Sequence, residues 1–111
     1  MNLRRSLPVA AVAVAALAAA PTLAAATRGV DVKDDFFKPS SLTIKKGTKV
    51  VWTWKGQGRH NVVVAMGPST FRSKIKRTGT YAHTFKHKGT WQLTCTVHPG
   101  MNMKVVVKKH L

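Results

Sequence analysis

Donor atoms suited to a soft metal lie close together near the C-terminus of the chain. Cys95, His98 and Met101 fall within seven consecutive residues, and Met103 follows two residues later. A further histidine, His60, lies 35 residues before Cys95. One thiolate, two imidazoles and a weak thioether form the donor set of a mononuclear blue-copper centre. The thiolate delocalises charge onto copper and a fixed cage moves little on reduction, so this set indicates one-electron chemistry.

Two other chemistries use the same residue types. A zinc site is the nearest alternative, but no carboxylate lies near these residues in the sequence to supply a good fourth ligand. A Cys95 nucleophile with a histidine base is the second, and nothing else in so short a chain indicates a substrate pocket. We therefore predict that the protein is not an enzyme. Because the chain has one cysteine, a CxxCH haem site and a CxxC redox pair are excluded.

The first 26 residues have the pattern of a secretory signal peptide. Two arginines form a positive start, residues 7–20 are apolar, and three alanines precede Thr27. We therefore predict a leader over residues 1–26, with cleavage before Thr27 and export to the periplasm or the extracellular face of the membrane. An uncleaved anchor is the alternative, although the alanine-rich segment is short and weakly apolar for that role. Residues 27–111 then form one domain.

The predicted mature domain is small and strongly basic. The chain of 111 residues contains 19 Lys and Arg against 3 Asp and Glu, and two of the arginines belong to the leader. A domain of this size buries a modest core and usually needs a disulfide or a metal for stability. A single cysteine cannot form an internal disulfide, and an exported free thiol is open to oxidation. Metal ligation by Cys95 would meet both needs.

Apolar residues alternate with polar residues in several short runs, which is typical of strands that bury one face. Glycine, proline and serine separate these runs, and no segment has a sustained helical period. We therefore predict an all-β fold, an antiparallel sandwich or barrel of about seven to eight short strands. The predicted strands lie near residues 30–32, 42–44, 50–54, 61–65, 80–85, 90–95 and 103–108.

Longer motifs surround the donor residues. The segment His60-Asn61-Val62 precedes Cys95-Thr96-Val97-His98-Pro99-Gly100-Met101, and the matching turns include Gly79-Thr80-Tyr81 and Gly89-Thr90-Trp91. In these motifs the chain resembles cupredoxins of the plastocyanin/amicyanin type, and the resemblance covers essentially the whole of residues 27–111. It implies a Greek-key β-sandwich with one type 1 copper ion at one end. It also implies one-electron transfer between protein partners.

The resemblance also implies the copper ligands, with His60, Cys95 and His98 in the equatorial positions. Met101 has the amicyanin-like spacing for the axial ligand, six residues after the cysteine, whereas Met103 has the plastocyanin-like spacing. In this family the axial methionine is typically followed by one variable residue, then glycine, then a strand that begins Lys-Val. The segment Met101-Asn102-Met103-Lys104-Val105 fits this pattern, with Met103 in place of the glycine, so we choose Met101. Electrons would pass through the edge of His98, which we expect to be ringed by Pro99, Gly100 and residues 66–68.

Three neighbouring residues are predicted to shape this site. Asn61 and Thr96 match family positions at which the asparagine ties the first histidine loop to the cysteine loop. Val97 stands where the family usually has proline, and it keeps its backbone N–H. We hypothesise that this N–H donates to the Cys95 sulfur and raises the reduction potential. The other histidines are expected in packing or on the surface: His83, His87 and His110.

The strong positive charge favours acidic partners and speeds encounter with them. We expect a monomer that meets an acidic redox protein or oxidase domain, with an anionic membrane or cell-wall surface as a second candidate. Export and the lack of a nucleic-acid motif argue against specific nucleic-acid binding. Two alternatives to electron transfer stay open. One is an extracytoplasmic copper carrier or buffer that delivers copper to another protein, and the other is a basic surface-binding module.

Overall fold

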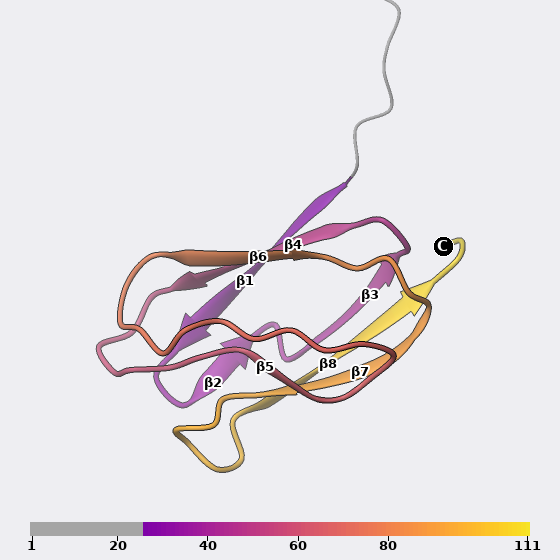
Figure 1. The fold of residues 1–111 in the computed structure, drawn as a ribbon. Helices are drawn as coiled ribbons and strands as arrows, with labels where there is room; N and C mark the ends of the chain where they lie inside the picture. The colour runs from indigo at the N-terminus through magenta and orange to yellow at the C-terminus, as the bar shows by residue number, and fades with distance from the viewer. Residues whose placement is uncertain (1–25) are drawn as a thin grey trace, which may run out of the picture.

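A computed structural model describes residues 26–111, and Figure 1 shows its fold. Among these residues there are eight strands, and no helix is long and apolar enough to cross a membrane. The predicted leader lies outside the described residues except for Ala26. The strands are β1 (Thr27–Lys33), β2 (Phe36–Lys38), β3 (Ser41–Lys45), β4 (Lys49–Trp54), β5 (Val63–Met66), β6 (Thr80–Thr84), β7 (Gly89–Thr94) and β8 (Asn102–Lys108).

The strands form two four-stranded sheets that pack face to face as a β-sandwich (Figure 1). One sheet has the order β2-β1-β4-β6, and the other has the order β3-β8-β7-β5. The predicted all-β sandwich is therefore confirmed. The apolar pattern does not predict β2, because Phe37 is the only buried residue of its three. The start of β5 at Val63 also differs from the prediction, which began the strand at Asn61.

The predicted antiparallel arrangement holds for four of the six strand pairs, but each sheet also contains one parallel pair, which was not predicted. β1 lies parallel to β4, with Val30 opposite Trp52, and β3 lies parallel to β8, with Ile44 opposite Val107. After the β1–β2 pair the chain crosses to the other sheet, so β3 pairs with the last strand rather than with a sequence neighbour. Alternation in a sequence defines the two faces of a strand but not the direction of its partner.

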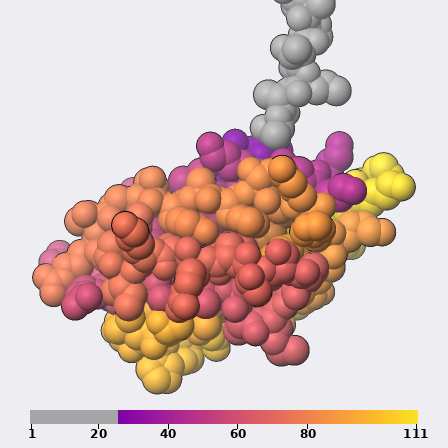
Figure 2. Space-filling view, viewed as in Figure 1, coloured from indigo at the N-terminus to yellow at the C-terminus, as the bar shows by residue number. Residues whose placement is uncertain are grey.

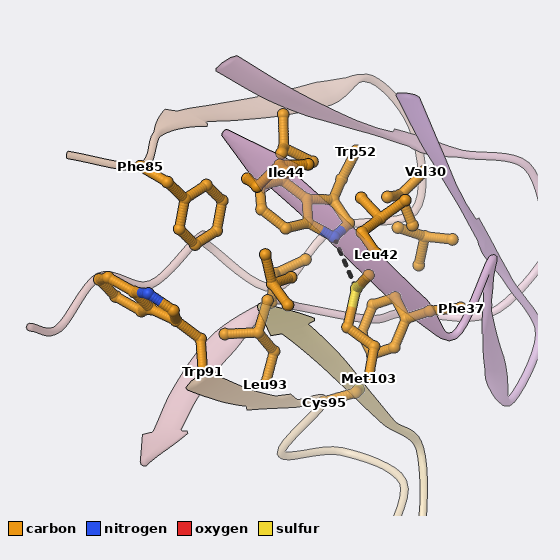
Figure 3. Packing of buried hydrophobic residues seen from close by; sticks show 14 of the residues in the cluster. Val30, Phe37, Leu42, Ile44, Trp52, Phe85, Trp91, Leu93, Cys95 and Met103 are labelled. Carbon is orange, nitrogen blue, oxygen red and sulfur yellow. Dashed lines mark hydrogen bonds between the residues drawn. The ribbon is translucent and has the colours of Figure 1, made fainter. Parts of the chain in front are cut away.

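Inward side chains from both sheets form one apolar core. In β4 the predicted alternation is present, since Val50, Trp52 and Trp54 are buried and the residues between them are partly exposed. The indole N–H of Trp52 donates a hydrogen bond to Met103 Sδ at 3.4 Å, from one sheet to the other (Figure 3). A buried indole N–H needs such a partner, so this bond helps to fix how β4 lies over β8.

The loops sort to the two ends of the sandwich. Three of them are joined by hydrogen bonds at one end, which we call the site end: residues 34–35, 55–61 and 95–101. The opposite end carries the β3–β4 turn, the β6–β7 turn, the start of β1 and the C-terminus (Figure 1). The predicted metal ligands therefore come from two loops that the fold brings to the same end.

Candidate metal centre

Three of the predicted ligands meet at the site end. The Nδ1 atoms of His60 and His98 are 3.1 Å apart, and Cys95 Sγ lies 3.9 Å and 3.8 Å from them, respectively. A point equidistant from the three atoms lies about 2.1 Å from each. This distance is close to the bonds of about 2.0–2.3 Å that histidine nitrogen and cysteine sulfur make to a first-row metal such as zinc. The donor atoms therefore fit one metal ion, which agrees with the predicted trigonal set.

The donor residues differ sharply in their exposure. His60, Cys95 and Met101 have relative exposures of 1%, 2% and 1%, whereas the side chain of His98 is 34% exposed. The buried donors are shielded from water and from large reagents. The outer edge of His98 is the part of the donor set that a partner protein can contact.

The β7–β8 loop holds its donors by backbone hydrogen bonds. Cys95 N–H donates to the carbonyl of Met101 at 2.9 Å, and Met101 N–H donates to the carbonyl of His98 at 3.1 Å. Gly100 has a φ of 87°, a left-handed conformation that glycine adopts without steric cost. The loop can therefore turn tightly enough to return Met101 to the level of Cys95.

The two methionines have different surroundings. Met103 is 2% exposed, and its sulfur accepts the Trp52 hydrogen bond inside the sandwich core (Figure 3). Met101 is buried at the closing end of the loop that carries Cys95 and His98. Met101 therefore lies in the ligand loop next to the other donors, and its role as the axial thioether stays a prediction. Met103 packs at the start of β8.

Asn61 and Thr96 lie side by side, and two hydrogen bonds between them join the two ligand loops. Asn61 Nδ2 donates to Thr96 Oγ1 at 2.9 Å, and Thr96 N–H donates to Asn61 Oδ1 at 2.8 Å. Asn61 is 2% exposed. Since each residue directly follows a ligand in the sequence, these bonds fix the distance between His60 and Cys95 without any metal present.

Asp34 is a site residue that the sequence analysis missed. Its Oδ1 lies 3.0 Å from Nε2 of His60, and its carboxylate also accepts hydrogen bonds from the backbone N–H groups of Gln57 and Gly58 at 2.8–3.0 Å. The His60 hydrogen bond, followed by the two backbone bonds, lowers the pKa of Asp34 to about 2. An ionised carboxylate only accepts hydrogen bonds, so Nε2 carries the proton and Nδ1 keeps a lone pair for the metal.

One residue in the sequence is consistent with the Asp34–His60 contact, and it is a glycine in the loop before His60. A Cβ atom on Gly56 would lie 2.3 Å from Asp34 Oδ1, so a side chain there would displace the carboxylate. The expectation that no carboxylate lies near the donors is therefore wrong for the folded protein, in which Asp34 contacts His60. The carboxylate nevertheless contacts the outer nitrogen of His60 rather than the face with the donor atoms, so it does not supply the fourth ligand of a zinc site.

A second carboxylate lies beside the other histidine. Asp35 Oδ1 is 3.4 Å from Nε2 of His98, and its side chain is 72% exposed. Asp35 has a φ of 72°, which is uncommon for a residue other than glycine, although aspartate and asparagine tolerate it better than most. The turn that carries Asp34 and Asp35 thus contacts the outer nitrogens of both histidines.

The remaining predicted residues do not touch the donor atoms. Val97 is 40% exposed, and the hydrogen-bonding groups found near Cys95 Sγ in the described part of the chain are the two histidine nitrogens. The hydrogen bond from Val97 to the cysteine sulfur therefore stays a prediction. His83 packs as expected, with its ring 3.9 Å from that of Phe71 in a stacked arrangement. His87 and His110 are exposed at the opposite end.

Comparisons with known proteins agree with this geometry. The sequence model of the copper binding proteins of the plastocyanin/azurin family matches residues 24–108. Amicyanin-alpha from Methylorubrum extorquens is 33% identical over 103 residues, which cover 89% of this chain and 87% of that protein. Plastocyanin from Dryopteris crassirhizoma is 32% identical over 91 residues, which cover 68% of this chain and 89% of that protein.

Solved structures show the same likeness. An oxidised amicyanin variant is 30% identical with a TM-score of 0.66, covering 81% of this chain and 90% of that one. A copper-containing nitrite reductase from Thermus scotoductus is 25% identical with a TM-score of 0.70, but this chain spans only a quarter of that reductase. The fold, the donor geometry and these matches together show that the chain belongs to the copper-binding plastocyanin/azurin family, with copper as its cofactor.

Proposed function

We propose that this protein is an exported carrier of single electrons. The observation that supports this function is the uneven exposure of the donor set, in which three donors are buried and one histidine edge reaches the surface. A carrier needs one contact point for its partners and a site closed to other reagents. The edge of His98 meets the first need, and the burial of His60, Cys95 and Met101 meets the second.

The residues around the site favour rapid electron exchange. Bound copper would supply the one-electron couple between Cu(I) and Cu(II). The Asn61–Thr96 pair and the Asp34–His60 contact hold the donor atoms in place before metal binds. Because the protein frame sets the positions of these atoms, they need to move little when one electron is gained or lost. A small rearrangement lowers the barrier to electron transfer.

We further propose that the protein does not turn over a substrate of its own. A substrate would have to reach the donors, and the three buried ones are closed to it. The proposed partner is an acidic redox protein or oxidase domain that meets a monomer of this protein in the periplasm or outside the cell. Exposed Lys55 and Arg59 in the loop before His60 offer it positive charge beside the site.

The proposal is tested by adding Cu(II) to the processed, copper-free protein and recording absorption and EPR spectra. An intense visible thiolate-to-copper band that saturates at one equivalent, with narrow copper hyperfine splitting, is the expected result. The matched control is Cys95→Ser, which keeps the size of the side chain and removes the thiolate. Wild-type protein that stays colourless, or that loses copper while its thiol is oxidised, would contradict a preformed type 1 site.

A second measurement separates electron transfer from copper delivery, because both functions would use the same ligands. Electron self-exchange between oxidised and reduced protein can be measured by NMR line broadening, and copper retention by competition with a Cu(I) chelator. Fast exchange with tight retention is expected of an electron carrier. Slow exchange with ready transfer of Cu(I) to an acceptor protein would instead identify the protein as a copper carrier or buffer.

A further inference from the structure

The end of the sandwich opposite the copper site carries a dense group of lysines. They come from the end of β3, the turn after it, the start of β4, the β6–β7 turn, the end of β8 and the residue after β8, and all of them are exposed. We call this group the basic pole, and it consists of Lys45, Lys46, Lys49, Lys86, Lys88, Lys108 and Lys109.

Backbone contacts place these segments side by side. Lys45 is the direct partner of Lys108 in the parallel β3–β8 pair, and Lys46 N–H donates to the carbonyl of Lys108 at 2.7 Å. Gly47 N–H donates to the carbonyl of Phe85, the residue before Lys86, also at 2.7 Å. Figure 2 shows the magenta, orange and yellow atoms of these segments gathered at the upper right of the molecule.

The charge of the basic pole is not balanced within the domain. The three acidic residues of the chain lie in β1 and the turn after it, toward the site end: Asp31, Asp34 and Asp35. The ion pairs of the described residues involve only His60 and His98. Lys45 and Lys108 are register partners in the parallel β3–β8 pair, so two like charges lie on neighbouring strands and repel each other. The fold therefore gains no stability from this group, which points to a partner outside the molecule.

The chain also enters the domain at this pole. Lys49 N–H donates to the carbonyl of Ala26 at 2.9 Å, and Thr27 lies opposite Lys49 at the start of β1. The predicted leader of residues 1–26 is joined to the domain here. If it is cleaved before Thr27, a positively charged α-amino group is added to the pole. The lysines thus lie at the end of the domain where the predicted leader would join it.

We propose that the basic pole docks on the anionic phospholipid headgroups of a membrane surface. Juxtamembrane lysines are attracted to anionic lipids, each by an amount equivalent to about fivefold in affinity. In this orientation the site end points away from the membrane, and the exposed edge of His98 is free for a redox partner. The proposal rests on the proposed export but not on electron transfer, because the lysines and the copper ligands are at opposite ends.

The test is co-sedimentation of the processed, copper-loaded protein with vesicles, after mass spectrometry has identified its N-terminus. Vesicles of phosphatidylcholine alone are compared with vesicles that also contain phosphatidylglycerol, at low and high salt. The pole variant replaces five lysines by glutamine: Lys45, Lys46, Lys86, Lys88 and Lys108. The matched control removes the same charge from other surfaces: Lys33, Lys38, Lys55, Lys74 and Lys104.

Binding to phosphatidylglycerol vesicles that weakens with salt is expected, with little binding to phosphatidylcholine. Five factors of about fivefold multiply to about 3,000-fold, so the pole variant should lose at least about a hundredfold in affinity, and the control variant much less. Equal losses in the two variants would show that total charge rather than the pole causes binding. Equal binding to both vesicle types would show an apolar contact instead. No binding at low salt would leave a soluble acidic protein as the partner. Each of these three results would overturn the proposal.

The orientation has a separate readout. Reduction of the oxidised protein by an uncharged reductant such as hydroquinone is followed at the visible copper band, with and without vesicles. The rate should stay nearly the same when the protein is bound, because His98 lies away from the lipid. A strong decrease in the reduction rate on binding would mean that the site end faces the membrane. That result would refute the proposed orientation even if the protein binds to the vesicles. A failure of the proposed electron transfer would not change the sedimentation result.

Discussion

Asp34 and His60 form a contact that sets the chemistry of the donor site from outside it. The carboxylate lies 3.0 Å from Nε2 of the ring, and the two backbone N–H groups of Gln57 and Gly58 hold the carboxylate in turn. This chain of contacts fixes the orientation of the ring and directs Nδ1 toward the other donors. The turn between β1 and β2 thus belongs to the metal centre although it supplies no ligand.

Replacement of Asp34 by asparagine should weaken copper binding by about 10–100-fold, the usual effect of losing a partner that orients a metal ligand. The asparagine keeps the shape of the side chain but loses the charge that fixes the proton on Nε2. Affinity is measured by competition with a chelator of known strength. Asp31→Asn is the matched control, since Asp31 lies on β1 away from the histidines. Equal affinities for Asp34→Asn and wild type would show that the contact does not support the ligand.

Replacement of Asn61 by alanine should destabilise the copper-free protein by about 1–3 kcal/mol, because two hydrogen bonds are lost and the Thr96 N–H is left without its partner. Urea unfolding followed by tryptophan fluorescence measures this change. Asn102→Ala, at an exposed position of β8, should have little effect. If the two variants were equally stable, the link between the ligand loops would have no part in holding the empty site.

The two methionines should respond differently to replacement by leucine. Met101→Leu should shift the reduction potential and the visible spectrum, because the axial ligand tunes both in this type of site. Met103→Leu should leave the spectrum unchanged but lower the stability by about 1–3 kcal/mol, because the buried Trp52 N–H loses its acceptor. Voltammetry and urea unfolding of both variants check this pair of expectations. A spectral change in Met103→Leu alone would assign the axial position to Met103.

The sequence was sufficient to predict that His60, Cys95 and His98 meet and that the fold is a β-sandwich, and insufficient for what depends on strand direction. Cys95, His98 and Met101 are close along one loop, so their meeting follows from local spacing. The Asp34 contact depends on β1 lying parallel to β4, which brings the end of β1 beside the loop before His60. Alternation of apolar residues does not contain that direction. The same limit explains why the two parallel pairs, β1–β4 and β3–β8, were not predicted.

His83 gives the protein a pH dependence that is separate from the copper site. Its ring stacks on Phe71, and burial, followed by the charge of Lys86, lowers the pKa of His83. The folded protein therefore binds fewer protons here than the unfolded chain, whose histidine has a pKa of about 6.5. The free energy of unfolding is therefore highest above about pH 6.5, where His83 is neutral in both states. It decreases as the pH falls from there toward the lower pKa of the folded state, because the unfolded chain takes up the proton first.

The prediction is that copper-free wild-type protein loses more thermal stability between about pH 7.5 and pH 5 than His83→Phe does. Phenylalanine can keep the stacking on Phe71 but cannot take up a proton. All other histidines are the same in the two proteins, so the difference between the two melting curves isolates His83. Lys86→Gln should show an intermediate dependence, because it removes only the smaller of the two causes. If wild type and His83→Phe lost stability in parallel over this range, the ring of His83 would have to take up its proton as readily in the folded protein as in the unfolded chain.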